Sequence, residues 1–169
     1  MKKYRNPVVA ACATLAATAA IVVPALATPS SGFTRAELST GLLGPVEVRA
    51  EVKGDHGDKW EVRLRTRDDS DLGLDRLTIV DGGHSGWHTH AGITMVTVTA
   101  GEILWYDGAS AGCPATTYRV GDSFVEPADH VHLVQNVSGG TAEFTAVQIR
   151  PRGTPGRIDA QQPEGCPTF

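Results

Sequence analysis

The sequence predicts an all-β protein whose strands close into one sandwich or barrel. Short segments with alternating apolar and polar residues follow one another along most of the chain, and this two-residue period is typical of half-buried strands. Turn residues separate nearly all of these segments. Helical segments do not alternate with them, which argues against a parallel α/β sheet. With 169 residues, the chain is long enough for a single domain with a hydrophobic core.

The first 27 residues have the pattern of a bacterial Sec-type signal peptide. A basic beginning precedes an apolar, Ala-rich run over residues 7–23, and residues 25–27 are small enough for cleavage before Thr28. Pro24 and the short apolar run argue against an uncleaved membrane anchor. Cys12 mimics a lipoprotein acceptor, but cleavage there would leave almost no apolar segment before it. We therefore expect a secreted, extracellular product that has no membrane partner after cleavage.

The charge of the mature chain disfavours nucleic acid as a partner. Cleavage removes three basic residues and no acidic ones, so the formal charge changes from −4 to −7. An acidic surface repels phosphate backbones. Arg63, Arg65 and Arg67 form the only basic cluster, and their two-residue spacing is that of the outer face of a strand.

The predicted domain spans residues 28–150. Its first strands are expected at residues 46–52 and 60–66, both half-buried, whereas residues 34–42 have weak helical character. Pro and Gly recur in residues 151–169, which predicts an irregular tail that runs over the surface. Further strands are expected at residues 76–80, 87–90, 94–99, 102–106, 116–120, 123–126, 130–136 and 142–150.

His88, His90 and His132 are the candidate metal ligands. Each lies in a predicted strand, and strand side chains two positions apart point to the same face. His88 and His90 can therefore aim at one point, and His132 can complete a three-imidazole site from a second strand. One alternative stays open, in which the three imidazoles are satisfied core residues without a metal.

Two stretches of the sequence resemble the two motifs of the cupin superfamily. The first motif is matched by Gly82, His88, His90 and Gly101, and the second by Gly121, Pro127, His132 and Asn136. Within the superfamily, the chain looks most like the small, secreted, single-domain bacterial proteins of the type-2 cupin group. The resemblance implies a cupin jelly roll, the double-stranded β-helix barrel, in which imidazoles converge on a divalent metal ion. Fe, Mn, Ni, Cu and Zn all remain open. Because cupins often form dimers, the resemblance also allows a homodimer.

One departure from the cupin pattern affects the expected site. The pattern places a glutamate four residues after the second histidine, and this sequence has Thr94 there. Asp129 also replaces a common glycine of the second motif. The expectation is then a site of three neutral ligands, as in three-histidine cupins and His₃ zinc sites. The missing carboxylate would either open a position for a bidentate anionic substrate or lower the affinity for the metal.

The other histidines are weaker candidates. His130 has the same strand parity as His132, so it could be a fourth ligand or a partner of a ligand, or it could lie outside the barrel. Thr94 could also contact the site as a fourth or neighbouring group. His84 and His56 lie in Gly- and Asp-rich segments and are expected to be exposed.

Strand parity also predicts the wall of a pocket beside the metal. The residues expected there are Thr94, Val96, Val98, Val134 and Gln148. Such a wall is mostly apolar with a few polar groups, which suits a small-molecule ligand or substrate. None of the polar groups is a strong base, so no catalytic residue can be assigned from the sequence.

The mature chain would contain two cysteines, Cys113 and Cys166, each in a Gly-Cys-Pro tripeptide. Export to an oxidising compartment favours a disulfide between them, which would hold the C-terminal tail against the Cys113 loop. The alternative is a pair of free thiols.

Two functions of different class fit these features. The first is a metal-dependent oxidoreductase, of the dioxygenase type, that acts on a small organic anion. The second is a non-catalytic extracellular module that binds a small ligand or a metal.

Overall fold

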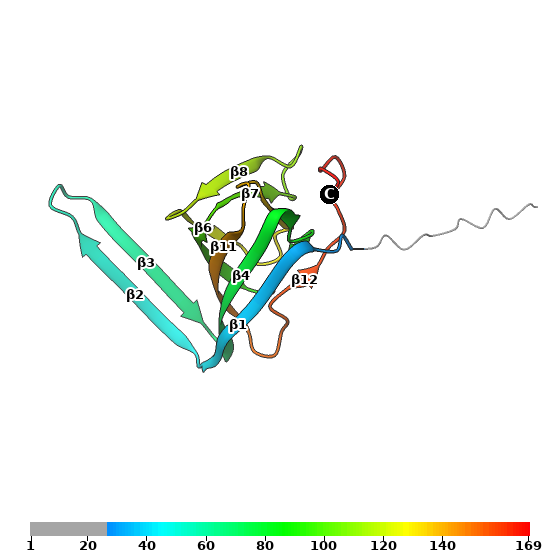
Figure 1. Cartoon of the computed structure of the whole chain (residues 1–169). Helices are drawn as coiled ribbons and strands as arrows, with labels where there is room; N and C mark the ends of the chain where they lie inside the picture. Colours follow the sequence, from blue (N-terminus) through cyan, green and yellow to red (C-terminus); the bar gives the residue numbers. More distant parts are fainter. Residues whose placement is uncertain (1–26) are drawn as a thin grey trace, which may run out of the picture.

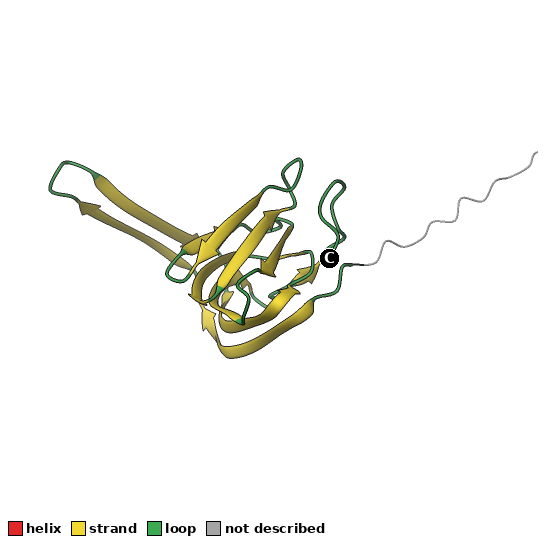
Figure 2. Cartoon of the chain, turned by 45° about the horizontal axis from the view of Figure 1, so that its top comes forward, coloured by secondary structure: helices red, strands yellow, loops and turns green. Residues whose placement is uncertain are grey.

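The computed structural model describes residues 27–169, so the predicted signal peptide lies outside the described residues except for Ala27. The described chain contains no helix, and so no helix there could span a membrane. Its strands form one antiparallel sheet that curls into a nearly closed barrel, plus a separate hairpin (Figures 1 and 2). The strands are β1 (Ser31–Leu43), β2 (Val46–Lys53), β3 (Lys59–Thr66), β4 (Ser70–His84), β5 (His88–Thr89), β6 (Ile93–Ala100), β7 (Glu102–Asp107), β8 (Ala115–Arg119), β9 (Ser123–Glu126), β10 (His132–Asn136), β11 (Ala142–Pro151) and β12 (Ile158–Asp159).

The barrel consists of two facing groups of strands that share β4. β1 pairs with β4 along nearly its whole length, β11 pairs with the first part of β4, and β11 continues the sheet through β6 to β9. The end of β4 pairs with β10, at His84 and Gln135, and β10 also pairs with β5 and β7. Gly83 allows β1 to lie close to the end of β4, because a Cβ there would lie 2.7 Å from the backbone oxygen of Ser31. This single-domain, all-β jelly roll confirms the predicted fold class.

The barrel interior follows the strand parity expected from the sequence. On β6, Val96 and Val98 are buried while Met95 and Thr97 face outward, and β11 buries Phe144 by the same alternation. These side chains belong to a core of nine buried residues, which are Ile79, Val96, Val98, Ile103, Phe124, Val134, Ala142, Phe144 and Ala146. One end of the barrel is therefore filled with apolar side chains, and the buried histidines lie beside this core.

The weak helical character of residues 34–42 proved to be a wrong prediction. This segment belongs to β1, which pairs with β4 along nearly its whole length, from Ser31 with His84 to Leu43 with Ser70. Ladder pairing with a long neighbour outweighed a weak local preference.

The hairpin formed by β2 and β3 projects from the barrel as an arm (Figure 1). Both strands were predicted, but the expected half-burial is wrong. The apolar face of the arm is exposed, with Val48 at 52%, Val52 at 58% and Trp60 at 57% relative exposure. The opposite face carries ion pairs such as those of Arg49 with Glu51 and with Glu61, each at 2.8 Å. Period-two alternation reports which side chains share a face, but it does not report whether another layer covers that face.

Substituting Trp60 on the arm is expected to have little effect on folding. Trp60→Ser removes one cross-strand pair, with Val52, from a hairpin that contributes little to the barrel core. Such a pair contributes about 0.2–1 kcal/mol. Thermal unfolding should therefore shift by no more than a few degrees. A loss of the folded barrel in Trp60→Ser would contradict the separation of arm and core.

The C-terminal tail is largely irregular, as expected, but it includes β12, which pairs with β5. The sulfur atoms of Cys113 and Cys166 are at disulfide distance, with the two Cα atoms 5.3 Å apart. Both cysteines are buried beside Trp87 and Leu133 in a second apolar cluster. The tail is thus fixed to the barrel at two places, one of which is next to the candidate ligand His88.

Candidate metal centre

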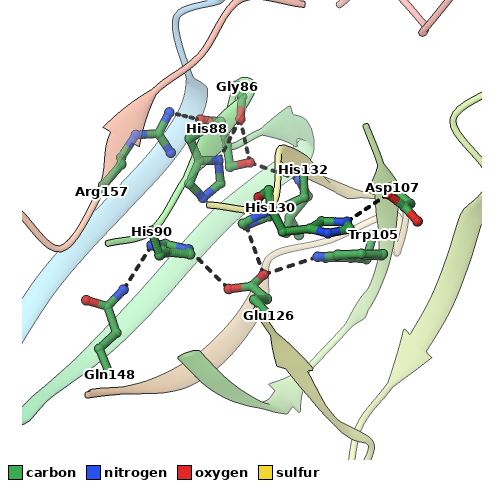
Figure 3. A network of polar contacts seen from close by, with 12 residues as sticks. Gly86, His88, His90, Trp105, Asp107, Glu126, His130, His132, Gln148 and Arg157 are labelled. Carbon is green, nitrogen blue, oxygen red and sulfur yellow. Dashed lines mark hydrogen bonds and ion pairs between the residues drawn. The ribbon is translucent and has the colours of Figure 1, made fainter. Parts of the chain in front are cut away.

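His88, His90 and His132 meet inside the barrel. Their ligand nitrogens all lie within 4.8 Å of one another, and all three side chains are buried. His88 and His132 are directly opposite each other in the β5–β10 pair, and His90 follows β5 by one residue. The local i, i+2 spacing and one strand pairing therefore bring together three imidazoles from two segments (Figure 3).

Each of these imidazoles is oriented by a backbone carbonyl. The Nδ1 atom of His88 lies 2.9 Å from the carbonyl oxygen of Gly86, and that of His132 lies 2.8 Å from the carbonyl oxygen of His130. The Nδ1 atom of His90 lies 2.6 Å from the carbonyl oxygen of Gly156. A carbonyl can only accept, so Nδ1 carries the proton in all three rings. The Nε2 atoms are then free to bind a metal, which is the arrangement typical of histidine ligands.

Glu126 adds a carboxylate that the sequence did not lead us to expect. Its Oε2 lies 3.1 Å from Nε2 of His90, and its Oε1 lies 3.1 Å from Nε2 of His132. The side chain of Glu126 is almost completely buried. The site of three neutral ligands stays a prediction, and Glu126 brings a negative charge next to two of the three imidazoles.

The donor set fits a divalent transition metal. Nε2 of His132 is buried and has no hydrogen-bond partner within the described chain, although Glu126 is close by. Two ligands bonded to one ion at about 2.1 Å and at a right angle lie about 3.0 Å apart. The contacts of Glu126 with His90 and His132 are close to this separation. The unpaired nitrogen and the short contacts are both accounted for if the four groups surround one cation.

The charges at the centre also suit a cation. Burial raises the pKa of Glu126, but the charges and hydrogen bonds of His132 and His90 together outweigh it and hold this pKa well below its usual range. Burial lowers the pKa of His88 well below its usual value, and the neighbouring charges of His132 and Arg157 add to this effect. Burial also lowers the pKa of His132, but the carboxylate of Glu126 raises it by more. Glu126 and His132 thus stabilise each other's charged forms, and a metal ion bound by the Nε2 atoms would take the place of the positive charge of His132 beside this carboxylate.

Thr94, which occupies the position of the motif glutamate, is a neighbour of Glu126. Thr94 on β6 pairs directly with Glu126 on β9, so the two side chains lie side by side on the inner face of the sheet. The hydroxyl of Thr94 is buried and has no hydrogen-bond partner among the residues that the structure describes. The carboxylate of this site thus comes from β9 and not from the motif position on β6. Thr94 contacts the site as a neighbouring group.

Trp105 positions this carboxylate. Its indole Nε1 donates a hydrogen bond of 3.2 Å to Oε1 of Glu126, and its ring stacks on His132 with ring centroids 5.8 Å apart. Glu126 is thus held between Trp105 and the histidines (Figure 3).

His130 does not join the cluster through its side chain. Its Nε2 lies 2.7 Å from Oδ1 of Asp107, and its ring stacks on Trp105. Only its backbone carbonyl serves the site, as the acceptor for His132. Of the positions left open for His130, the structure shows one outside the cluster, because His130 lies in the irregular segment between the turn after Pro127 and β10.

The remaining histidines divide between surface and interior. His56 is exposed at the tip of the arm, as expected. His84 was expected to be exposed, but only 7% of it is accessible. It ends β4, its Nδ1 accepts a hydrogen bond from the backbone N–H of Gly86, and its ring contacts Phe169 from the tail. The position of the tail over this segment depends on the fold and leaves no local pattern in the sequence.

Asp129, which replaces a motif glycine, adopts a positive φ of 58°. Aspartate tolerates this conformation better than most residues, so the turn is preserved without glycine. The backbone N–H of Asp129 donates a 2.9 Å hydrogen bond to the carbonyl of His90. This contact ties the turn before β10 to the first motif.

A cavity of about 50 Å³ adjoins the imidazoles. Four of the five predicted wall residues line it, namely Thr94, Val96, Val134 and Gln148. Val98 does not, because it lies one step further along β6 and packs into the apolar core. The cavity also includes Phe33, Leu77 and Phe144, so its walls are mainly apolar.

The C-terminal tail forms part of this site. The carbonyl of Gly156 accepts hydrogen bonds from Nδ1 of His90 and from Nε2 of Gln148, the latter at 2.9 Å. Gly156 and Arg157 also line the cavity. The tail is therefore more than a surface strap, because it orients one ligand and supplies part of the wall.

One sequence signal could have identified Glu126. In the predicted strand at residues 123–126, Glu126 shares its parity with Phe124, which places a carboxylate on the apolar face. A buried carboxylate must be paired or bind a metal. The pairing of β9 with β6, which brings Glu126 to the histidines, is not visible in local periodicity.

Comparison with known proteins agrees with this architecture. A family model described as "Cupin domain" matches residues 76–148. No curated protein matches the chain. Similar solved structures include Peruvianin-I, a cysteine peptidase from Thevetia peruviana latex, with 26% identity over 54% of this chain and 56% of that one, and a TM-score of 0.47.

Two further structures resemble the chain. An oxalate oxidase has 23% identity, covers 53% of this chain and 46% of its own, and has a TM-score of 0.47. The polyketide cyclase RemF from Streptomyces resistomycificus has 16% identity, with 56% and 63% coverage and a TM-score of 0.46. The chain thus spans about half of the length of the first of these structures.

Proposed function

Because this chain belongs to the cupin superfamily, we propose that it is a divalent-metal protein in which His88, His90, His132 and Glu126 hold the ion. We further propose that it acts as a metal-dependent oxidoreductase on a small organic anion. The observation that carries the proposal is the convergence of three buried imidazoles beside a cavity, with the carboxylate of Glu126 3.1 Å from Nε2 of two of them.

The donor set indicates which ions to expect. Three imidazoles and one carboxylate suit Fe, Mn, Ni, Cu or Zn, whereas Ca²⁺ and Mg²⁺ prefer an all-oxygen set. Four protein ligands leave positions free on an ion that prefers six. A bound ion of this class would supply Lewis-acid or redox chemistry to an anion that occupies those positions.

The protein residues around the ion have separate roles in this proposal. Glu126 lowers the net charge of the centre, and Trp105 fixes its orientation. The Gly156 carbonyl holds His90, and Gln148 donates a hydrogen bond to the same carbonyl. The apolar walls from Val96 and Phe144 limit the access of water to the bound anion.

The protein is proposed to work outside the cytoplasm. The predicted leader and the Cys113–Cys166 pair both support this location, because disulfides persist in oxidising compartments. The ligand at the site would then be a small molecule met after export.

Metal removal tests the proposal. The protein purified from its own host is expected to contain about one transition-metal ion per chain by elemental analysis. Dialysis against a chelator should lower the melting temperature, because an ion at a thousand times its Kd stabilises the folded state by about 4 kcal/mol. Fe, Mn, Ni, Cu and Zn are then added back one at a time, and the ion found by elemental analysis should restore the melting temperature. Oxygen uptake in the presence of small carboxylates should follow the same metal.

The outcomes separate the two functional classes. Metal-dependent oxygen uptake supports the oxidoreductase. A metal-dependent ligand affinity without turnover would instead identify the non-catalytic binding module. Protein that holds no stoichiometric metal and gains no stability from any of the five ions would contradict both.

A further inference from the structure

Arg157 brings an incompletely paired guanidinium into the cavity beside the candidate metal centre. Its Nη1 is buried and has no hydrogen-bond partner within the described part of the chain. Arg157 lines the same cavity as His88 and His90. A buried donor without a partner costs free energy, and the cost is larger for a charged group. The cavity therefore contains an unused site for an acceptor.

The guanidinium is held in place by three contacts. Its Nη2 donates to the carbonyl of Ser85 at 2.8 Å, and its Nε donates to Oδ1 of Asp159 at 2.6 Å. The ring of Phe33 lies 5.9 Å from its central carbon. Since two of its three nitrogens are engaged, the orientation of Nη1 is fixed before any ligand arrives.

Arg157 lies beside the proposed metal ligands. Figure 3 shows the guanidinium beside His88. Because Arg157, His88 and His90 line the same cavity, a ligand there can contact both the guanidinium and the proposed ion.

The other charged pair in the cavity is already balanced. Nε of Arg35 lies 2.9 Å from Oδ2 of Asp75, and this carboxylate is almost completely buried. Arg157 has a weaker counter-charge, because the side chain of Asp159 is 61% exposed and so is screened by water. The remaining lining is largely apolar, with Phe33, Leu77 and Phe144.

We propose that Arg157 binds the carboxylate of a monoanionic ligand that has an apolar body. This inference rests on the proposed function, because the same carboxylate would face the ion held by the histidines. The apolar body would lie against the Phe33, Leu77 and Phe144 side chains. The ligand class is therefore an aliphatic or aromatic monocarboxylate, and Arg157 determines the specificity for its charge.

Calorimetric titration of the cobalt(II)-loaded protein with phenylacetate and with phenylacetamide tests the proposal. The amide has nearly the same shape and no charge, so it is expected to bind at least about 10-fold more weakly. Arg157→Gln should weaken phenylacetate binding by about 10- to 100-fold and leave phenylacetamide within about threefold. Arg157→Lys keeps the charge without the planar fork and should give an intermediate loss.

Arg152→Gln is the matched control. Arg152 lies on the same tail and carries the same charge, but it is 60% exposed and pairs with Asp69 away from the cavity. This variant should bind phenylacetate within about twofold of the original protein, since a screened surface charge acts weakly. Cobalt content and thermal unfolding of each variant show that the fold and the centre are retained.

The visible absorption spectrum of the bound cobalt gives a second readout. Phenylacetate should change it in the original protein and in Arg152→Gln. If both proteins bind cobalt and Arg157→Gln binds phenylacetate as tightly as the original protein does, this inference is overturned and the proposed metal centre is not. Failure of the protein to bind cobalt would overturn the proposed metal centre and this inference with it.

Discussion

Glu126→Gln is expected to weaken divalent-metal binding by at least about 100-fold. Changes to groups that only orient ligands already cost about 10- to 100-fold in metal affinity. Glu126 faces two imidazole nitrogens at 3.1 Å, and glutamine keeps its shape while removing its charge. A loss of metal affinity would therefore be caused by the missing charge of the Glu126 carboxylate. Competition with a chromophoric chelator measures the affinity directly.

Three variants make this result interpretable. Glu102→Gln removes a carboxylate that pairs with Arg119 at the surface, and it should leave metal affinity unchanged. His90→Ala should lose the metal, as Glu126→Gln does. The exchange Thr94→Glu with Glu126→Thr moves the carboxylate back across the β6–β9 pair and should recover much of the affinity. Unchanged metal binding in Glu126→Gln would show that this glutamate only balances the charge of His132.

Removing the Cys113–Cys166 link is expected to destabilise the protein by about 4 kcal/mol. The two cysteines are 53 residues apart, and cross-linking a loop of this length restricts the unfolded chain by about that amount in the chain-entropy account. The double variant Cys113→Ser/Cys166→Ser should therefore melt about 10 °C lower. Metal affinity should also fall, because the released tail carries the carbonyl that orients His90.

The single variants provide the control for this experiment. Cys113→Ser and Cys166→Ser break the same bond, so each should lower stability about as much as the double variant. The original protein in reducing buffer should behave like them. A double variant that melts within about 2 °C of the original protein would contradict a stabilising role of this link.

Local periodicity was sufficient for the fold class and for most strands. The two-residue alternation of β6 and β11 placed Val96, Thr94 and Gln148 on the inner face, and the structure agrees. The His-x-His spacing likewise places His88 and His90 on one face without knowledge of any partner strand. These features depend on backbone geometry over a few residues, so they can be derived from the sequence.

Features that depend on distant pairing could not be derived in this way. The exposed face of the arm has the same alternation as a covered strand, and only the absence of a facing layer within the described chain distinguishes it. For related reasons the exposure of His84 was predicted wrongly and the position of His130 could not be decided. The tail covers the first, and the turn before β10 directs the second to Asp107.

The sequence by itself determined a β-barrel with three inward imidazoles, because side-chain parity along a strand is a local property. Only the tertiary structure decided the rest of the centre. It brought the carboxylate of Glu126 opposite Thr94 and folded the tail so that Gly156 and Arg157 reach the cavity. The register of β6 with β9 and the path of the C-terminal tail set those positions, and both arise from packing between segments far apart in the chain.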